Sequence, residues 1–159
     1  MSPVDPLARP EELLRRVYAY VAYRVHDRNE AEDITGETFV RAVRYRDRYD
    51  SHQGEPIAWL LGIARRCIYD ASLRPRQVSP GSEPAVGGDL EGQVVERVTL
   101  ATALTALSPS DRDLIALRYG ADLSTREIAR VLEMRPGSVD VALSRARSRL
   151  KELLESDLE

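Results

Sequence analysis

Residues 123–147, LSTREIARVLEMRPGSVDVALSRAR, decide the fold of this 159-residue chain. Ser124 and Glu127 have the spacing of a capping box, which marks the start of a helix. Apolar residues then repeat at helical spacing on both sides of the turn EMRPG and predict two helices. Their inner faces would hold Ile128, Val131 and Leu132, then Val139, Leu143, Ala146 and Leu150. Two helices joined by a tight turn, the second rich in arginine, predict a helix-turn-helix DNA-binding unit.

The spacing across the turn distinguishes this motif from an ordinary helical hairpin, which shares much of the pattern. Ala129 is followed ten positions later by Val139. This pair fits the small residue at the helix crossing and the apolar anchor of a helix-turn-helix. Glu133 is a departure, because the turn usually carries glycine there.

Upstream of this unit the composition changes. Residues 74–93 hold three prolines, four glycines and little hydrophobic periodicity, which is typical of a flexible linker. Residues 77–96 contain four acids and no base, so the linker is acidic. We therefore predict a flexible N-terminus at 1–9 and two small helical domains, 10–74 and 94–156, joined by a linker at 75–93.

Both halves show helical periodicity and no alternating β pattern, which predicts an all-α fold. In the first half we expect a helix that ends near His26, a second capped by Asn29 and a third that starts at Pro56. The expected inward residues are Leu13, Leu14, Val17, Tyr18, Val21 and Val25, then Ala31, Ile34, Thr35, Thr38, Phe39, Ala42 and Val43, then Ile57, Leu60, Leu61, Ala64, Ile68 and Ala71. In the second half, a stripe from Val94 to Leu107 and a helix capped by Ser108 precede the helix-turn-helix.

The composition argues against several classes of protein. No apolar run or leader pattern indicates a membrane or secreted protein, so we expect a cytoplasmic location without membrane insertion. One cysteine allows no internal disulfide, and two distant histidines are poor material for a metal site. No catalytic motif or cofactor motif is evident, which argues against an enzyme. Arginine accounts for all but one of the 23 basic residues, which suits phosphate contacts but equally fits a GC-rich genome.

Three blocks of the chain together resemble the extracytoplasmic-function (ECF) sigma factors of bacterial RNA polymerase. NEAEDITGETFVRAVR, residues 29–44, is similar to the polymerase-binding helix. PIAWLLGIARRCIYDASLR, residues 56–74, is similar to the helix that handles the minus-ten promoter element. Residues 103–154 resemble the minus-thirty-five-binding domain, although this block alone would also suit a response-regulator-type DNA-binding domain.

The resemblance implies a transcription initiation factor that catalyses no reaction itself. It would bind core RNA polymerase through the beta and beta-prime subunits, recognise promoter DNA at the minus-thirty-five and minus-ten elements and promote strand opening. The acidic linker would thread through polymerase channels, although a solvated linker explains the same charge. Family analogy adds an anti-sigma protein as a further partner.

In the first domain, the resemblance assigns polymerase binding to one outward helix face and minus-ten DNA binding to a loop and the helix after it. The polymerase-binding residues are Asp33, Glu37 and Arg41, a pattern that a solvated face with local ion pairs also explains. Gly36 departs from the glutamine that is common in the family. The minus-ten residues are Ser51, His52, Gln53, Trp59, Arg65, Arg66 and Tyr69, which suit base capture and stacking, whereas a plain polar loop and a Trp59 in the core fit as well.

In the second domain, the minus-thirty-five contacts are expected on the outer face and flanks of the last helix, with one residue on the helix before it. They are Arg126, Ser138, Val141, Ser144, Arg145, Arg147 and Arg149. Asp140 is a departure, because the family often has basic or polar residues here. It could stabilise the helix start or accept a hydrogen bond from cytosine, and we favour the structural role.

Two hypotheses from other classes compete with the sigma factor. A stand-alone helix-turn-helix regulator would bind duplex DNA by itself, with an affinity that falls steeply in salt. A helical adaptor that binds only protein would neither bind duplex DNA nor direct core polymerase to promoters. The sigma factor would instead bind duplex DNA poorly alone and direct core polymerase to discrete start sites.

Overall fold

Helices form both halves of the chain in the computed structural model, which describes residues 4–75, 83–86 and 94–156. The N-terminal half contains α1 (Pro10–Arg24), α2 (Arg28–Arg44) and α3 (Pro56–Ser72), with the 3-10 turns η1 (Arg46–Arg48) and η2 (Ser51–Gln53) between α2 and α3. The C-terminal half contains α4 (Val94–Ala106), α5 (Pro109–Ile115), the π-helical turn η3 (Ala116–Gly120), α6 (Thr125–Leu132) and α7 (Pro136–Ser156). The described residues form no β-strand and only one isolated β-bridge, so the predicted all-α fold is confirmed.

Side-chain caps mark the starts of α2, α5 and α6. The capping box of Ser124 and Glu127 is present, and Ser108 accepts a hydrogen bond from the backbone N–H of Asp111, as predicted. The predicted cap at Asn29 is wrong, because the Asp27 carboxylate caps α2 by accepting from the Asn29 N–H. The predicted end of α1 near His26 is also too late, since the backbone is already extended at Val25, directly after Arg24.

The buried face of α1 differs from the predicted stripe. Tyr20 is fully buried, whereas Leu14 is 49% exposed. The reason lies in the packing, because α1 contacts α2 and α3 on one side and α5 and η3 on the other. A helix covered on two sides buries a wider face than a single apolar stripe predicts. On α2, the predicted inward residue Val43 is likewise 58% exposed.

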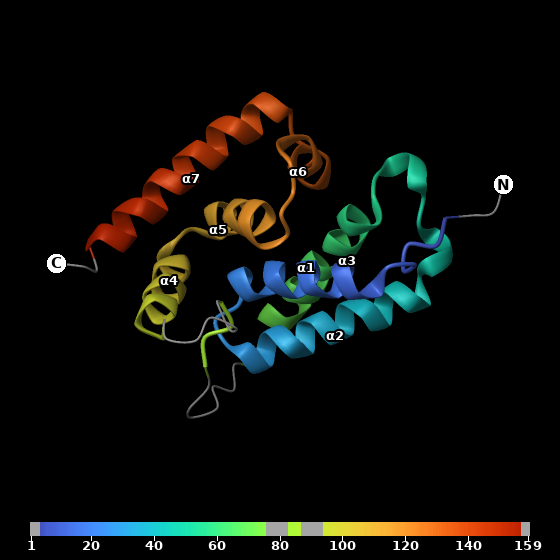
Figure 1. Ribbon diagram of the computed structural model, residues 1–159, viewed down its shortest axis with the longest axis horizontal. Coiled ribbons are helices and arrows are strands. Elements are labelled where there is room, and N and C mark those ends of the chain that lie inside the picture. The colour runs from blue at the N-terminus through green and yellow to red at the C-terminus, as the bar shows by residue number, and fades with distance from the viewer. Residues whose placement is uncertain (1–3, 76–82, 87–93, 157–159) are drawn as a thin grey trace.

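The two halves pack against each other through α1 and η3. Gly120 allows this close approach, because a Cβ there would lie 2.8 Å from the backbone oxygen of Ala19. Arg16 donates from Nε to the Ala121 carbonyl at 2.8 Å, and Arg112 donates from Nε to the Tyr23 carbonyl at 2.9 Å. Figure 1 shows α5 and α6 between α7 and the N-terminal helices, which leaves α7 along one edge of the molecule.

One part of the predicted linker packs on the N-terminal half. The backbone N–H of Arg28 donates to the Glu83 carbonyl at 3.0 Å, and Asp27 and Pro84 form an antiparallel bridge. Ala85 and Val86 are buried in the core. Burial of these apolar side chains holds residues 83–86 in place, which corrects the prediction of a flexible linker for this segment. Residues 76–82 and 87–93 of that linker lie outside the described structure.

Candidate nucleic-acid interface

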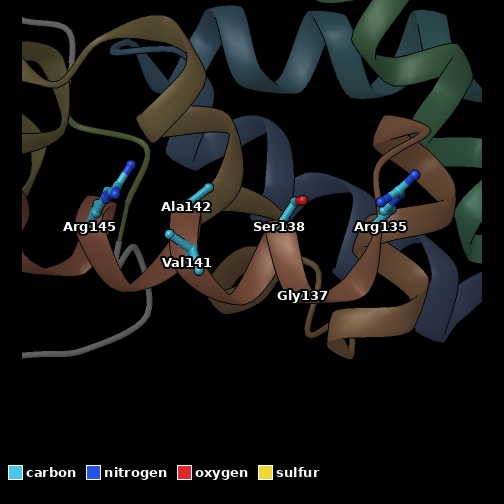
Figure 2. Close-up of a pocket in the computed structure, with 6 residues that line it drawn as sticks. All are labelled: Arg135, Gly137, Ser138, Val141, Ala142 and Arg145. Atoms are coloured by element: carbon cyan, nitrogen blue, oxygen red, sulfur yellow. The ribbon is translucent and has the colours of Figure 1, made fainter.

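The first turns of α7 carry a shallow, open hollow on the surface of the C-terminal half. Pro136 occupies the first helical position, and Val139, Leu143 and Ala146 turn inward and are buried. The opposite face is thereby left to solvent, and Figure 2 shows six side chains or backbone positions along it. They are Arg135, Gly137, Ser138, Val141, Ala142 and Arg145.

This hollow brings together three of the predicted minus-thirty-five residues, Ser138, Val141 and Arg145. Val141 is 51% exposed, which is high for an apolar side chain and suits contact with a thymine methyl group. Sequence reasoning missed Arg135, which lies in the turn directly before α7. Its signal was its place beside a helix N-terminus that is expected to face DNA.

The other predicted minus-thirty-five residues lie around the hollow. Ser144 and Arg126 are exposed, on α7 and α6 respectively. Arg147 donates to the Tyr119 hydroxyl at 3.3 Å. Arg149 forms an ion pair with Asp111 of α5 at 2.6 Å, so its guanidinium already has a partner inside the protein. Arg149 therefore has a structural role in this state, although its side chain is still largely exposed.

The predicted base-capture loop lies at the start of α3, where a second hollow faces α6. The exposed turn η2 consists of Ser51, His52 and Gln53. Gly54 follows with a positive φ of 145°, a backbone conformation that favours glycine. Trp59 is half-buried and meets the Tyr49 ring edge-on, with 5.5 Å between ring centroids. Trp59 is thus neither a core residue nor a free stacking platform, but a wall of this hollow.

On α3, two neighbouring arginines have different surroundings. Arg66 is exposed, pairs with Asp70 at 3.4 Å and lies over the Tyr69 ring at 5.7 Å, so both predicted residues remain on the surface. Arg65 instead pairs with Asp113 of α5, with 3.2 Å between Nη2 and Oδ2. The predicted minus-ten surface is therefore only partly open in this arrangement.

Asp113 is the centre of a buried polar cluster that sequence reasoning missed. Its carboxylate accepts from the Tyr20 hydroxyl and from Arg24 at 2.7 Å, and it forms an ion pair with Arg65. Burial, followed by the adjacent Asp113 charge, raises the pKa of Tyr20 well above its usual range, so the tyrosine stays protonated and donates. No local pattern could reveal this cluster, because Tyr20 and Asp113 are 93 positions apart.

Two of the three predicted polymerase-binding residues on α2 are paired with each other. Asp33 and Glu37 are exposed, whereas Arg41 pairs with Glu37 at 3.0 Å and with Asp70 of α3 at 2.9 Å. Arg41 thus joins α2 to α3. Exposed Val40 and Val43 lie on the same helix and add apolar surface that the prediction omitted.

The described ranges contain neither a candidate metal centre nor a candidate membrane span. No group of three histidine, cysteine, aspartate or glutamate side chains there could hold a metal ion. None of the helices in these ranges has the length and apolar character needed to cross a bilayer.

Comparisons with known proteins agree on one family. Residues 11–77 match the family model of sigma-70 region 2, and residues 97–150 match that of sigma-70 region 4. The chain is 34% identical to the ECF RNA polymerase sigma factor BldN of Streptomyces coelicolor, over 89% of this chain but 57% of that protein. It is 30% identical to the ECF sigma factor SigK of Mycobacterium ulcerans, over 87% of this chain and 76% of that protein.

A solved structure has a similar fold over both halves. The sigma factor RpoE from Bartonella quintana, in complex with the anti-sigma factor NepR, aligns with a TM-score of 0.68 and 25% identity. The alignment covers 91% of this chain and 93% of that one.

Proposed function

The chain belongs to the ECF sigma factors of the sigma-70 family, which are transcription initiation factors, and on this premise we propose how its surfaces divide the work of promoter recognition. The hollow on α7 binds the minus-thirty-five element. The exposed side of η2 and α3 binds the minus-ten element. The outer face of α2 docks on core RNA polymerase.

The observation that carries the proposal is the character of the α7 hollow. Small residues, Gly137, Ser138 and Ala142, occupy much of it, and Arg135 and Arg145 lie toward its two ends in Figure 2. A helix with small residues on its exposed face can approach the floor of the major groove closely, while arginines at the ends reach phosphates or guanine edges.

The exposed side of η2 and α3 has side chains suited to binding the minus-ten element. Arg66 and Tyr69 are exposed side by side on α3, and the η2 turn offers polar groups beside the Trp59 wall. Base stacking on aromatic rings and phosphate contact by arginine are the two means by which proteins hold single-stranded DNA. Arg65 would join them only after its ion pair with Asp113 opens, so we expect the two halves to separate when promoter DNA is bound.

Polymerase docking is assigned to α2, since its outer face combines charge with apolar surface. Asp33 and Glu37 supply acidic groups, and Val40 and Val43 are each more than half exposed. Such a mixed face suits burial in a protein interface better than solvent. An anti-sigma protein is a further partner by analogy with the RpoE complex.

The test is run-off transcription with purified core polymerase on genomic fragments. We expect discrete start sites that depend on the added chain. Arg145→Ala should lower initiation at these sites about tenfold, because one good arginine–guanine contact is worth about 1–3 kcal/mol. Arg15→Ala, which removes an exposed arginine on α1, is the matched control and should leave initiation unchanged.

Failure of the chain to start transcription at any promoter would overturn the proposal. The family matches do not favour the stand-alone regulator, which would bind duplex DNA strongly without polymerase. A gel-shift titration at two salt concentrations separates the two.

A further inference from the structure

Asp140, the acidic residue in the second turn of α7, is engaged by a chain of hydrogen bonds that spans three elements. The Thr125 hydroxyl donates to Asp140 Oδ1 at 3.0 Å. The same hydroxyl accepts from Arg118 Nη2 at 2.6 Å. Arg118 belongs to η3, Thr125 begins α6 and Asp140 lies on α7. These hydrogen bonds therefore connect both helices of the helix-turn-helix to the preceding turn.

The chemistry of the three groups fixes the direction of every hydrogen bond. A guanidinium can only donate and an ionised carboxylate can only accept, whereas a hydroxyl has one proton to give. Thr125 must therefore accept from Arg118 and direct its single proton at Asp140. Both bonds involve an ionised group, which makes them shorter and stronger than bonds between neutral groups.

The anchor at Thr125 is itself well placed. It is the first residue of α6, directly after the Ser124 cap, and the Ser124–Glu127 capping box holds this turn. Arg118 lies on η3, which packs against α1 through Gly120. The Asp140 carboxylate is therefore tied to a part of the domain that other contacts already position.

The position of Asp140 on α7 determines how its hydrogen bond with Thr125 affects the orientation of the helix. Val139 is buried in the C-terminal half, whereas Val141 lines the α7 hollow. Each residue along a helix is rotated by about 100° from the one before it. Asp140 lies between them, on the flank that reaches α6, and does not line the hollow. Apolar packing at Val139 and Leu143 sets how closely α7 approaches, but it is not directional. The directional hydrogen bond from Thr125 restrains rotation of the first turns of α7 about the helix axis, as the Arg149–Asp111 ion pair does farther along the helix.

We propose that Asp140 is a positioning residue, which acts through Thr125 and Arg118 to fix the rotation of α7 and hence the angle at which its hollow meets the bases. The inference rests on the proposed function, since it concerns the surface assigned to the minus-thirty-five element. It explains why an acid is tolerated near DNA: the carboxylate faces α6 and has a guanidinium one hydroxyl away.

Loss of this restraint would affect all reading residues together, because they turn with the helix as one body. Preference at several base pairs of the minus-thirty-five element should then weaken at once. A residue that reads one base would instead change preference at one position. A residue that only stabilises the fold would lower total activity and leave the preference unchanged.

The experiment is initiation by core polymerase from a promoter library with a randomised minus-thirty-five element, read by sequencing the transcripts. Thr125→Val removes the hydroxyl and keeps the shape, and Thr125→Ser keeps the hydroxyl as the matched control. We expect Thr125→Val and Asp140→Ala to reduce discrimination about threefold to tenfold at several positions, with the serine variant close to the parent. A changed preference at a single base pair with Asp140→Ala, or no change with either variant, overturns the inference.

A second measurement does not depend on transcription. A double-mutant cycle of Thr125→Val and Asp140→Ala in urea unfolding of the full chain reports the coupling between the two side chains. We expect the unfolding constants to deviate from additivity by about twofold to tenfold, the range for one net hydrogen bond. Additive effects refute the link. A parent chain that shows the coupling but starts no transcription refutes the proposed function and leaves the link in place.

Discussion

Replacing Asp113 with alanine removes the one carboxylate that Tyr20, Arg24 and Arg65 share, and we expect it to weaken the contact between the two halves strongly. The side chain of Asp113 is 10% exposed and that of Arg24 is 18% exposed. Removal of one partner from a buried ion pair costs about 3–5 kcal/mol, because the other charge stays buried without a counter-charge. The Tyr20 hydroxyl also loses its acceptor inside the core.

The size of the effect follows from these exposures. Because Arg24 retains some access to water, the cost of leaving it without Asp113 lies near the low end of the range of about 3–5 kcal/mol for a broken buried ion pair. Arg65 is 38% exposed on its side chain and adds at most about 1 kcal/mol. We therefore expect Asp113→Ala to lower the free energy of unfolding by about 3 kcal/mol, and Asp113→Asn, which keeps an oxygen acceptor for Tyr20, to lower it by less.

Equilibrium urea unfolding followed by circular dichroism measures the change by linear extrapolation. Glu152→Ala, at an exposed position of α7, is the control and should stay within about 0.5 kcal/mol of the parent. A loss below about 1 kcal/mol for Asp113→Ala would show that water replaces the carboxylate without cost. The cluster would then contribute nothing to closure of the two halves.

Three further predictions concern the backbone and the reading helix. Gly120→Val should separate the two halves and raise the radius of gyration in small-angle X-ray scattering, because a Cβ would meet the Ala19 oxygen at 2.8 Å; an unchanged radius contradicts the close packing. Glu133→Gly should raise the free energy of unfolding by about 1 kcal/mol, since Glu133 adopts φ 55° and glycine has no Cβ to strain there; thermal or urea unfolding checks the sign. Val141→Ser should weaken initiation selectively at promoters with thymine in the minus-thirty-five element, measured with the same promoter library, and an equal loss at all promoters would argue against a methyl contact.

Much of the fold could be predicted from the sequence because its determinants are local. The capping box at Ser124, the Ser108 cap and the start of α3 at Pro56 each depend on residues within one helical turn. The inward faces of α6 and α7 follow from helical periodicity, which also predicts Val141 and Arg145 on the outer side of α7. The wrong cap at Asn29 is a small error of the same kind, since two adjacent polar residues compete for the position.

The partners of individual side chains could not be predicted in this way. Arg65 and Arg66 are neighbours of the same type, yet one pairs across the interface with Asp113 and the other stays exposed on α3. Nothing in the sequence around Asp140 indicates that the fold brings Thr125, 15 positions away, within hydrogen-bond distance of its carboxylate. Exposure of Val43 and burial of Tyr20 likewise depend on which helices cover α1 and α2.

The sequence by itself determined the helices, their order and the outward face of α7, because hydrogen bonds between residues a few positions apart and a repeating apolar stripe specify them. Only the tertiary structure decided which charges are engaged. Pairs such as Arg24 and Asp113, 89 positions apart, form when independent helices pack. Periodicity within one helix holds no information about the side chains that another helix brings to it.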